Sequence, residues 1–289
     1  MASDRFNHFE SRLNFWESDS TLLDRSSFPR RMEILDAIDA FLSGFNLADS
    51  APISDLVNRA HAYSAKINRL NDYFFASMRR EIKAGIAPSE LQRRVQQFAS
   101  APPCGIAYDD LDDIIAGVLQ FEPPSEEPRP LGAESVFYQP TPARHIFHLF
   151  TAAAVTQADT LIDLGSGLGH LPLLASICTG ASAIGIELDP AWVVSATKCA
   201  TALNLSSVSF LAQNALNADL SSGTVFYLYT PFTGTTLASV LESLREQSTL
   251  RPIRICTFGP CAISVTHQSW LKPLTEPATD QITIFLPRT

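Results

Sequence analysis

The sequence has 289 residues, 46% of them hydrophobic, which is enough apolar material for the core of one large or two ordinary domains. Its formal net charge of −9 disfavours a broad phosphate-binding surface, so nucleic acid is disfavoured as a partner. The charged N-terminus lacks the apolar region of a signal peptide, no apolar stretch is long enough to span a bilayer, and the five cysteines have no C-x-x-C spacing. We therefore expect a cytoplasmic protein with reduced thiols and no membrane partner.

The first part of the chain shows only helical patterns. From Ser54, apolar residues recur at spacings of three and four as far as Gly85, a residue suited to end a helix. Shorter helical patterns cover residues 29–42, 89–98 and 108–119. We predict an all-helical N-terminal domain over residues 1–122, without a recognisable site of its own.

Four acids lie close together in the last of these patterns: Asp109, Asp110, Asp112 and Asp113. Such a cluster has two interpretations, a site for a metal or basic substrate and the first turn of a helix. Acids are favoured in the first turn because the helix dipole and the free N–H groups stabilise negative charge there. We prefer the second interpretation, since the helical pattern begins at these residues.

A proline-rich tract, PPSEEPRP, follows at residues 123–130. Four prolines in eight residues cannot sustain a helix and favour an extended chain. We predict that this tract links the helical domain to a second domain over residues 131–289.

A helical pattern from about residue 142 to 155 opens the second domain. Thr141 suits the N-cap and Pro142 the first helical position, so helix initiation explains both. It does not explain the preceding Tyr138. His145 and His148 lie one turn apart on this helix, but no third ligand is visible, and we predict no metal site.

The stretch from residue 160 to 190 has the order strand, glycine turn, helix, strand. Its first apolar run ends in Asp163 and passes into the turn Gly165-Ser-Gly167-Leu-Gly169, and its second run ends in Glu187. Glycines let a backbone turn tightly and approach a ligand, and an acid at this strand end is placed to accept hydrogen bonds from ribose hydroxyls. A nicotinamide cofactor is disfavoured, because His170 stands where G-x-G-x-x-G needs its third glycine.

The remaining strands follow in the order expected of an α/β domain. After a helix with an apolar stripe, strand patterns cover residues 208–212, 224–229, 253–258, 270–274 and 281–287.

The pattern D-x-G-x-G-x-G, with an acid at the end of the next strand, resembles class I S-adenosylmethionine-dependent methyltransferases. The resemblance implies an α/β fold with a seven-stranded Rossmann-like sheet, mostly parallel with an antiparallel last strand, and S-adenosylmethionine as cofactor. It places the glycine turn at the amino acid end of the cofactor, Glu187 at its ribose, and Asn214, where these enzymes often carry an acid, at its adenine. The cofactor residues so implied are Asp163, Gly165, Ser166, Gly167, Gly169, His170, Glu187, Leu188, Asn214, Ala215 and Tyr229.

The segment Phe137-Tyr-Gln-Pro-Thr141, together with DLGSGLGH, resembles the V-Y-x-x-T segment and turn of the non-SET histone lysine methyltransferases. This second resemblance places Tyr138 and Thr141 at the methionine moiety of the cofactor, and His170 where that class has a glutamine. An acidic chain without a lysine-rich tail does not support nucleosome binding.

The acceptor side is expected where the fourth strand ends, at Tyr229-Thr-Pro-Phe232. Amino-group methyltransferases often carry N-P-P-Y or D-P-P-F there, and this chain has Thr230 in place of the acid or amide. The resemblance gives Tyr138, Tyr229 and Phe232 as catalytic residues, two to orient or deprotonate an amine and one to face a cationic group. Pro231 and Phe232 would alternatively only end the strand.

Two functions follow from these patterns. The first is a methyltransferase that uses S-adenosylmethionine to methylate an acceptor such as an amine of a protein, peptide or small molecule. The alternative, favoured by Thr230, is a non-catalytic S-adenosylmethionine-binding protein whose helical domain binds a partner. The sequence leaves the oligomeric state open.

Overall fold

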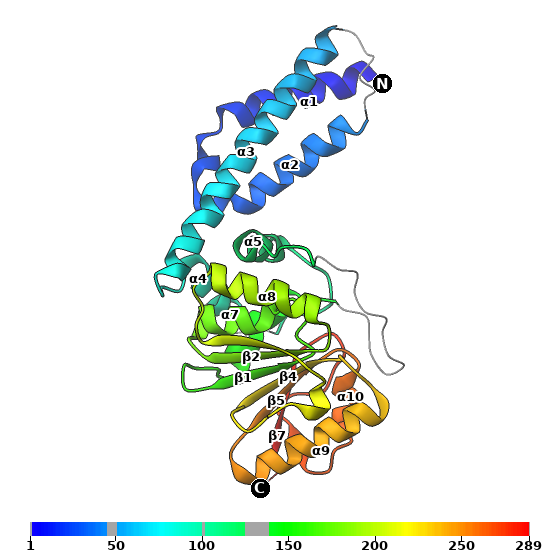
Figure 1. Ribbon diagram of the computed structural model, residues 1–289. Helices are drawn as coiled ribbons and strands as arrows, with labels where there is room; N and C mark the ends of the chain where they lie inside the picture. Colours follow the sequence, from blue (N-terminus) through cyan, green and yellow to red (C-terminus); the bar gives the residue numbers. More distant parts are fainter. Residues whose placement is uncertain (1, 45–50, 100–101, 125–138, 289) are drawn as a thin grey trace. The chain divides into compact units, whose positions relative to one another are not determined.

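The computed structural model describes residues 2–44, 51–99, 102–124 and 139–288. The chain forms two compact units, Met1–Met78 and Arg79–Thr289. Each unit has its own elements and is described separately (Figure 1).

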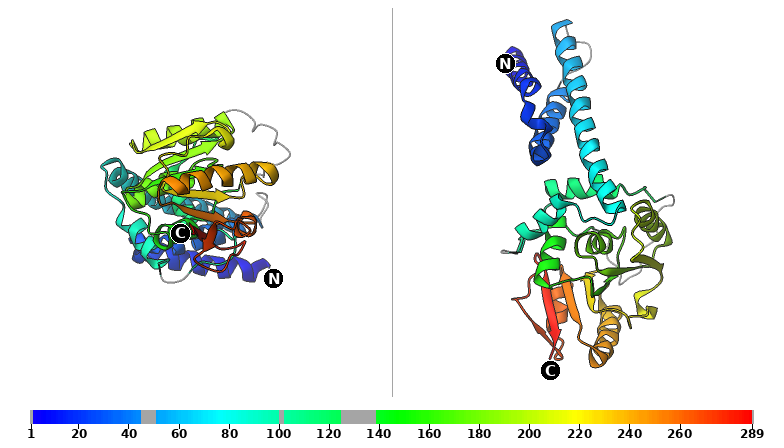
Figure 2. Two further views of the ribbon diagram at one scale, coloured as in Figure 1. Left: turned by 90° about the horizontal axis from the view of Figure 1, so that it is seen from below. Right: turned by 90° about the vertical axis from the view of Figure 1, so that its left-hand side faces the viewer.

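The first unit is helical and has its own core. Its elements are α1 (Ala2–Ser18), η1 (Ser20–Leu23), η2 (Arg25–Ser27), α2 (Phe28–Leu42) and most of α3 (Ala51–Lys83). The three long helices run side by side (Figure 2) and bury Leu13, Ile38 and Ile67 between them. The helices of this unit agree with the predicted helical character of the N-terminal region, and the long helix α3, which continues into the second unit, ends at Lys83, close to the predicted Gly85.

The boundary between the units differs from the predicted one. Helices α4 (Ser89–Gln97) and α5 (Asp110–Leu119) belong to the second unit, where both pack against α6 (Ala143–Ala152). Cys199 donates a hydrogen bond to the carbonyl of Leu119 (3.2 Å), and Ser195 to that of Glu122 (2.6 Å). The break therefore falls at Met78 and not at residue 122, and residues 125–130 of the predicted linker lie outside the described part of the chain.

The acid cluster begins helix α5, as predicted. The Asp109 carboxylate accepts a hydrogen bond from the N–H of Leu111 (2.9 Å), and the Asp112 carboxylate accepts one from the N–H of Asp109 (2.8 Å), which is a capping box. The other oxygen of Asp112 accepts from the N–H of Ala143 (2.8 Å) at the start of α6. One carboxylate therefore serves the first turns of two helices, and burial raises its pKa.

The second unit contains a seven-stranded sheet in the order β3-β2-β1-β4-β5-β7-β6. The strands are β1 (Thr160–Leu164), β2 (Ser182–Glu187), β3 (Val208–Ala212), β4 (Val225–Tyr229), β5 (Arg254–Phe258), β6 (Leu271–Pro273) and β7 (Thr283–Pro287). The first five are parallel, and β7 runs antiparallel to both β5 and β6. The predicted sheet, mostly parallel with an antiparallel last strand, is confirmed.

Helices cover both faces of this sheet. The helices are α6, α7 (His170–Thr179), α8 (Pro190–Ala202), α9 (Gly234–Leu250) and α10 (Cys261–Thr266), with a short η3 (Ala215–Asn217). Figure 1 shows α7 and α8 on one face and α9 and α10 on the other. The stripe of α8 is buried as predicted, and it includes Ala196 and Cys199. Among the described residues, no helix is long and apolar enough to cross a membrane.

Candidate functional site

The glycine turn joins β1 to α7 and fits only glycine at two of its positions. Gly165, Gly167 and Gly169 have φ values of 87°, 52° and 80°, which other residues rarely adopt. A Cβ at Gly165 would lie 2.3 Å from the Cβ of Pro231, and one at Gly169 would lie 2.3 Å from the ring of Phe210. The turn is therefore packed tightly against Pro231 and Phe210, which excludes larger side chains at these two positions.

Glu187, at the end of β2, is hydrogen-bonded to the turn. Its Oε2 accepts from the N–H of Gly167 (2.9 Å), and its Oε1 accepts from the N–H of Asp189 (3.0 Å). The N–H groups of Gly165 and Ser166 also donate to the carbonyl of Ile186 (2.8 and 3.0 Å). Because a carboxylate oxygen has two lone pairs, Glu187 keeps one on each oxygen for further donors such as ribose hydroxyls.

Asp163 lies at the bottom of the site and is only 5% exposed. Its register partners on the neighbouring strands are Gly185 and Tyr227. Burial, and secondarily the charge of Glu187, raise the pKa of Asp163 well above its usual value. A cation bound beside Asp163 would therefore stabilise the ionised form of this buried carboxyl group.

Ser166, in the glycine turn, is also buried, with 5% of its surface exposed. Its hydroxyl oxygen is buried and has no hydrogen-bond partner among the described residues. A Cβ on Gly185 would lie 2.6 Å from that oxygen. The missing side chain of Gly185 therefore provides the room in which the hydroxyl lies.

Thr141 contacts the site through a residue that the sequence analysis missed. Its Oγ1 lies 2.7 Å from the hydroxyl of Tyr227, which is 2% exposed and whose pKa is raised well above its usual value by burial. The prediction that Thr141 is the N-cap of α6 is wrong, because Pro142 takes that position without a side-chain bond. Tyr227 could have been noticed as one of two tyrosines in an otherwise apolar parallel strand.

Tyr138, the other residue placed at the methionine moiety, lies outside the described part of the chain. The segment that follows it is held in place: Tyr108 donates a hydrogen bond to the carbonyl of Pro140 (2.8 Å). Tyr108 was also missed, because it precedes β1 by many residues.

His170 begins α7 directly after the turn. Its ring lies 4.7 Å from that of Phe121, and burial lowers its pKa to about 4. The imidazole is therefore neutral at physiological pH and adds no charge to the site.

The expected adenine side has exposed apolar residues. Leu188 is 51% exposed and Leu216 is 43% exposed. Ala215, which directly precedes Leu216, is partly buried. The Oδ1 of Asn214 accepts a hydrogen bond from the N–H of Leu216 (2.9 Å) and starts η3. One lone pair of that oxygen is thus occupied, and the amide nitrogen takes no part in the bond.

At the end of β4, the residues predicted to face the acceptor differ in how far their side chains are buried. Tyr229 is partly buried, its ring lies 4.8 Å from that of Phe258, and burial raises its pKa. Thr230 is turned inward, since its Oγ1 accepts from the N–H of Cys261 (3.1 Å). Phe232 is 8% exposed and belongs to the core cluster with Leu237. Of the three residues, only Tyr229 offers a partly exposed side chain.

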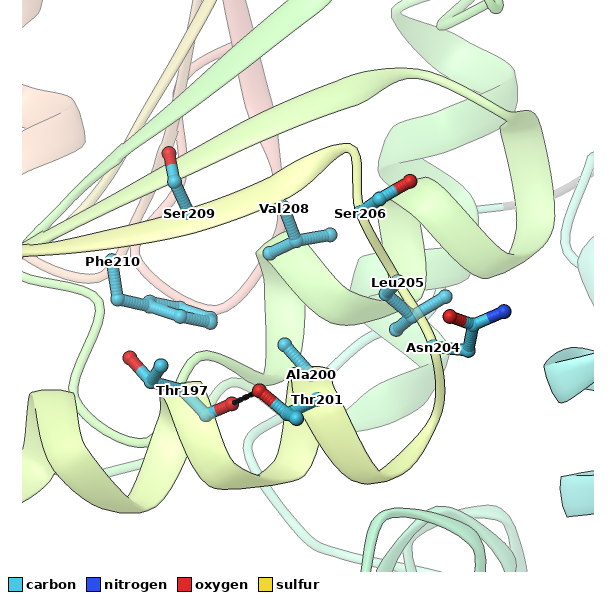
Figure 3. Close-up of a pocket in the computed structure, with 9 residues that line it drawn as sticks. All are labelled: Thr197, Ala200, Thr201, Asn204, Leu205, Ser206, Val208, Ser209 and Phe210. Carbon is cyan, nitrogen blue, oxygen red and sulfur yellow. Dashed lines mark hydrogen bonds between the residues drawn. The ribbon is translucent and has the colours of Figure 1, made fainter.

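The two histidines of α6 serve as structural hydrogen-bonding groups. His145 Nε2 lies 2.7 Å from the carbonyl of Gly105, and His148 Nδ1 lies 2.9 Å from that of Phe98. No group of three or more His, Cys, Asp or Glu in the described ranges could hold a metal ion. A cavity of about 280 Å³ lies elsewhere, between α8 and β3 (Figure 3).

No protein-family model and no curated protein matches the chain. Among solved structures, it is similar to an RNA methyltransferase from Salinibacter ruber in complex with S-adenosyl-L-homocysteine, at 26% identity and a TM-score of 0.44 over 52% of this chain and 95% of that one. It is also similar to the yhhF protein of Escherichia coli, assigned as a methyltransferase, at 18% identity and a TM-score of 0.43 over 50% of this chain and 87% of that one. A third is an rRNA methylase from Streptococcus thermophilus, at 11% identity and a TM-score of 0.39 over 52% and 99%.

The fold class follows from the sheet itself. Five parallel strands in the order 3-2-1-4-5, completed by an antiparallel β7 between β5 and β6, form the seven-stranded Rossmann-like methyltransferase sheet. In such sheets, ligands bind outside the carboxyl ends of the strands where the strand order reverses. Here that point lies between β1 and β4, next to the glycine turn.

We predict that Asp163→Asn stabilises the ligand-free protein at pH 8. A carboxyl whose pKa is raised by folding favours the folded state at low pH, and this contribution is lost as the pH rises through the folded pKa. The melting temperature of the variant should exceed that of the wild type at pH 8, and the difference should shrink as the pH falls toward about 4. Thermal unfolding across this range measures it, with Asp36→Asn at an exposed position of α2 as control. A wild type that melts higher at pH 8 would contradict the prediction.

A second prediction concerns Phe232. Because this ring is buried in the core, Phe232→Ala should lower the free energy of unfolding by about 3–5 kcal/mol. Leu250→Ala, at a position that is 74% exposed on α9, should change it by less than about 0.5 kcal/mol. Urea unfolding of both variants decides the matter, and equal effects would show that Phe232 is not a core residue.

Proposed function

We propose that the protein is an S-adenosylmethionine-dependent methyltransferase. The observation that carries the proposal is the hydrogen bond from the glycine turn to Glu187, because it brings the two motifs of the sequence pattern to one edge of the sheet. The same segment of β1 and the turn carries the buried Asp163 and the unpaired hydroxyl of Ser166.

The residues at this edge fit S-adenosylmethionine. Glu187 would accept hydrogen bonds from the ribose hydroxyls, and Leu188 and Leu216 would cover an adenine ring. The ammonium group of the methionine moiety would offset the cost of ionising Asp163, and the carboxylate or ammonium would find a partner in Ser166. When bound, the cofactor supplies an activated methyl group on a sulfonium.

The chain's own contribution to transfer would be alignment. An in-line displacement needs the acceptor held opposite the leaving sulfur, and correct positioning alone lowers such barriers greatly. Tyr229 is the described residue at the end of β4 that could orient an amine, since its partly exposed phenol stays protonated at neutral pH. Tyr138 keeps its proposed role beside it as an expectation from the resemblance. Phe232 lies in the core, which supports its interpretation as a strand-ending residue.

The class of acceptor is proposed as an amine of a protein, peptide or small molecule. The finer resemblance to non-SET histone lysine methyltransferases rests on the segment with Tyr138 and Thr141 and on the turn DLGSGLGH, and the solved structures described above lend it no support. Two of those structures are named as acting on RNA, so RNA enters as a competing acceptor.

A non-catalytic cofactor-binding protein is the second candidate. The observation that favours it is the inward orientation of Thr230 and Phe232, which leaves the end of β4 without the exposed acid or amide and aromatic of many amino-group enzymes. In this alternative, the helical first unit would bind a partner.

Binding is tested with Glu187→Gln, which keeps the size of the side chain and removes its charge. We expect micromolar binding of S-adenosylmethionine by the wild type and a loss of about 1.5–3 kcal/mol in the variant, or roughly a 10- to 150-fold higher Kd. Isothermal titration measures both, with the exposed Glu246→Gln as control. Tighter binding of NADH than of S-adenosylhomocysteine would refute the cofactor assignment.

Catalysis is tested by incubating the protein with methyl-labelled S-adenosylmethionine and a cell lysate divided into protein, RNA and small-molecule fractions. Label in protein or in small molecules supports the proposed acceptor class, and label that ribonuclease releases would show an RNA acceptor instead. Glu187→Ala serves as the binding-deficient control. Tight cofactor binding without label in any fraction would favour the non-catalytic candidate.

A further inference from the structure

Strand β3 ends the sheet on one side. Within the described part of the chain it pairs with β2 alone, so one of its edges has no strand partner. Natural proteins usually protect such edges with charged residues, prolines or bulges, because an open edge can pair with another chain.

The backbone groups on the open edge can be assigned from the pairing with β2. Ser207 accepts a hydrogen bond from Ala183 (3.0 Å), and Gln213 donates one to Glu187 (2.9 Å). In a parallel ladder, alternate residues direct both backbone groups to the same neighbour. The odd-numbered residues of β3 therefore face β2, and the N–H and C=O of Phe210 and Ala212 point outward.

This edge carries no charge. Residues 199–218 contain no Asp, Glu, Lys, Arg or His, although 18% of the whole chain is charged. The stretch contains no proline either, and Leu211 and Leu216 are 40% and 43% exposed. The usual protection against edge pairing is thus absent from the whole stretch.

The cavity between α8 and β3 adjoins the same edge. Figure 3 shows the ring of Phe210 facing Thr197 and Thr201 of α8, while Ser209 points to the opposite side of the strand. The cavity of about 280 Å³ leaves room on the α8 side for side chains of an added strand. All the residues that line it are uncharged.

We propose that β3 is the interface of a symmetric homodimer, in which two copies of β3 pair antiparallel and join two sheets into one. A contact about a twofold axis brings the same patch of both copies together. Phe210 would then lie opposite the partner subunit's Phe210 and exchange both backbone hydrogen bonds with it, and Ala212 would lie opposite the partner's Val208.

The charge distribution favours a second copy as the occupant. Two chains of formal charge −9 repel each other over most of their surfaces. A contact through residues 199–218 brings no like charges face to face, so this edge is the place where two copies meet at least electrostatic cost. The proposal does not depend on the catalytic function.

The test is the mass of the full-length protein in solution, measured by sedimentation velocity and light scattering at micromolar concentration. We expect the wild type at twice the chain mass of 31.6 kDa. Ala212→Pro removes an outward N–H without removing a bond to β2, and Thr201→Glu places a charge in each copy at the interface; both should be monomers. Thr249→Glu, at an exposed helical threonine with the same type of back-bonded hydroxyl, should remain a dimer.

Hydrogen exchange of the wild type gives a second measurement that needs no variant. The amides of Phe210 and Ala212 should exchange more slowly at high than at low protein concentration. A wild type that stays monomeric, or a dimer in which these amides are unprotected at all concentrations, would overturn the proposal. A dimer that persists in folded Thr201→Glu would do so as well.

Discussion

The hydrogen bond from Gly167 to Glu187 is the interaction on which the site depends. It closes the turn after β1 onto the end of β2, and it can form because the two strands are parallel and in a register that sets Leu164 opposite Ile186. A shift of β2 by one residue in that register would turn Glu187 to the opposite face of the sheet, while Asp163 is aligned with Tyr227 by the separate pairing of β1 with β4. The positions of Glu187 and Asp163 are therefore set by strand pairing.

One row of residues crosses the sheet at the level of Asp163. It runs from Phe210 through Gly185, Asp163 and Tyr227 to Cys256, each the register partner of the next. Gly185 is the position in this row that has no room for a side chain, because a Cβ there would lie 2.4 Å from the ring of Phe210. Its small size lets an aromatic ring support the turn from one side while an acid and a phenol occupy the centre of the sheet.

The sequence was sufficient where structure is decided locally. The glycine turn, Glu187 and the strands could be predicted because spacing and residue type within a few positions determine them. Thr141 was misassigned as a helix cap because the partner of its hydroxyl lies 86 residues away on β4. Phe232 looked like an acceptor-site residue because a strand end does not show which way its last side chains turn. Helices α4 and α5 were assigned to the N-terminal domain but belong to the second unit. An apolar stripe predicts that a helix face is buried, but it does not show which element packs against that face.

Asp112 has a consequence for how the protein can be divided. Its carboxylate belongs to α5 but also accepts a hydrogen bond from the first turn of α6. The start of α6 is therefore capped by a residue that precedes the proline-rich tract in the chain. A fragment that begins at residue 131 would lose this cap. It would also lose the carbonyl groups of Glu122 and Leu119, which accept hydrogen bonds from the Ser195 hydroxyl and the Cys199 thiol of α8. A fragment that keeps these contacts must therefore include α5, and the second compact unit as a whole begins at Arg79, within α3.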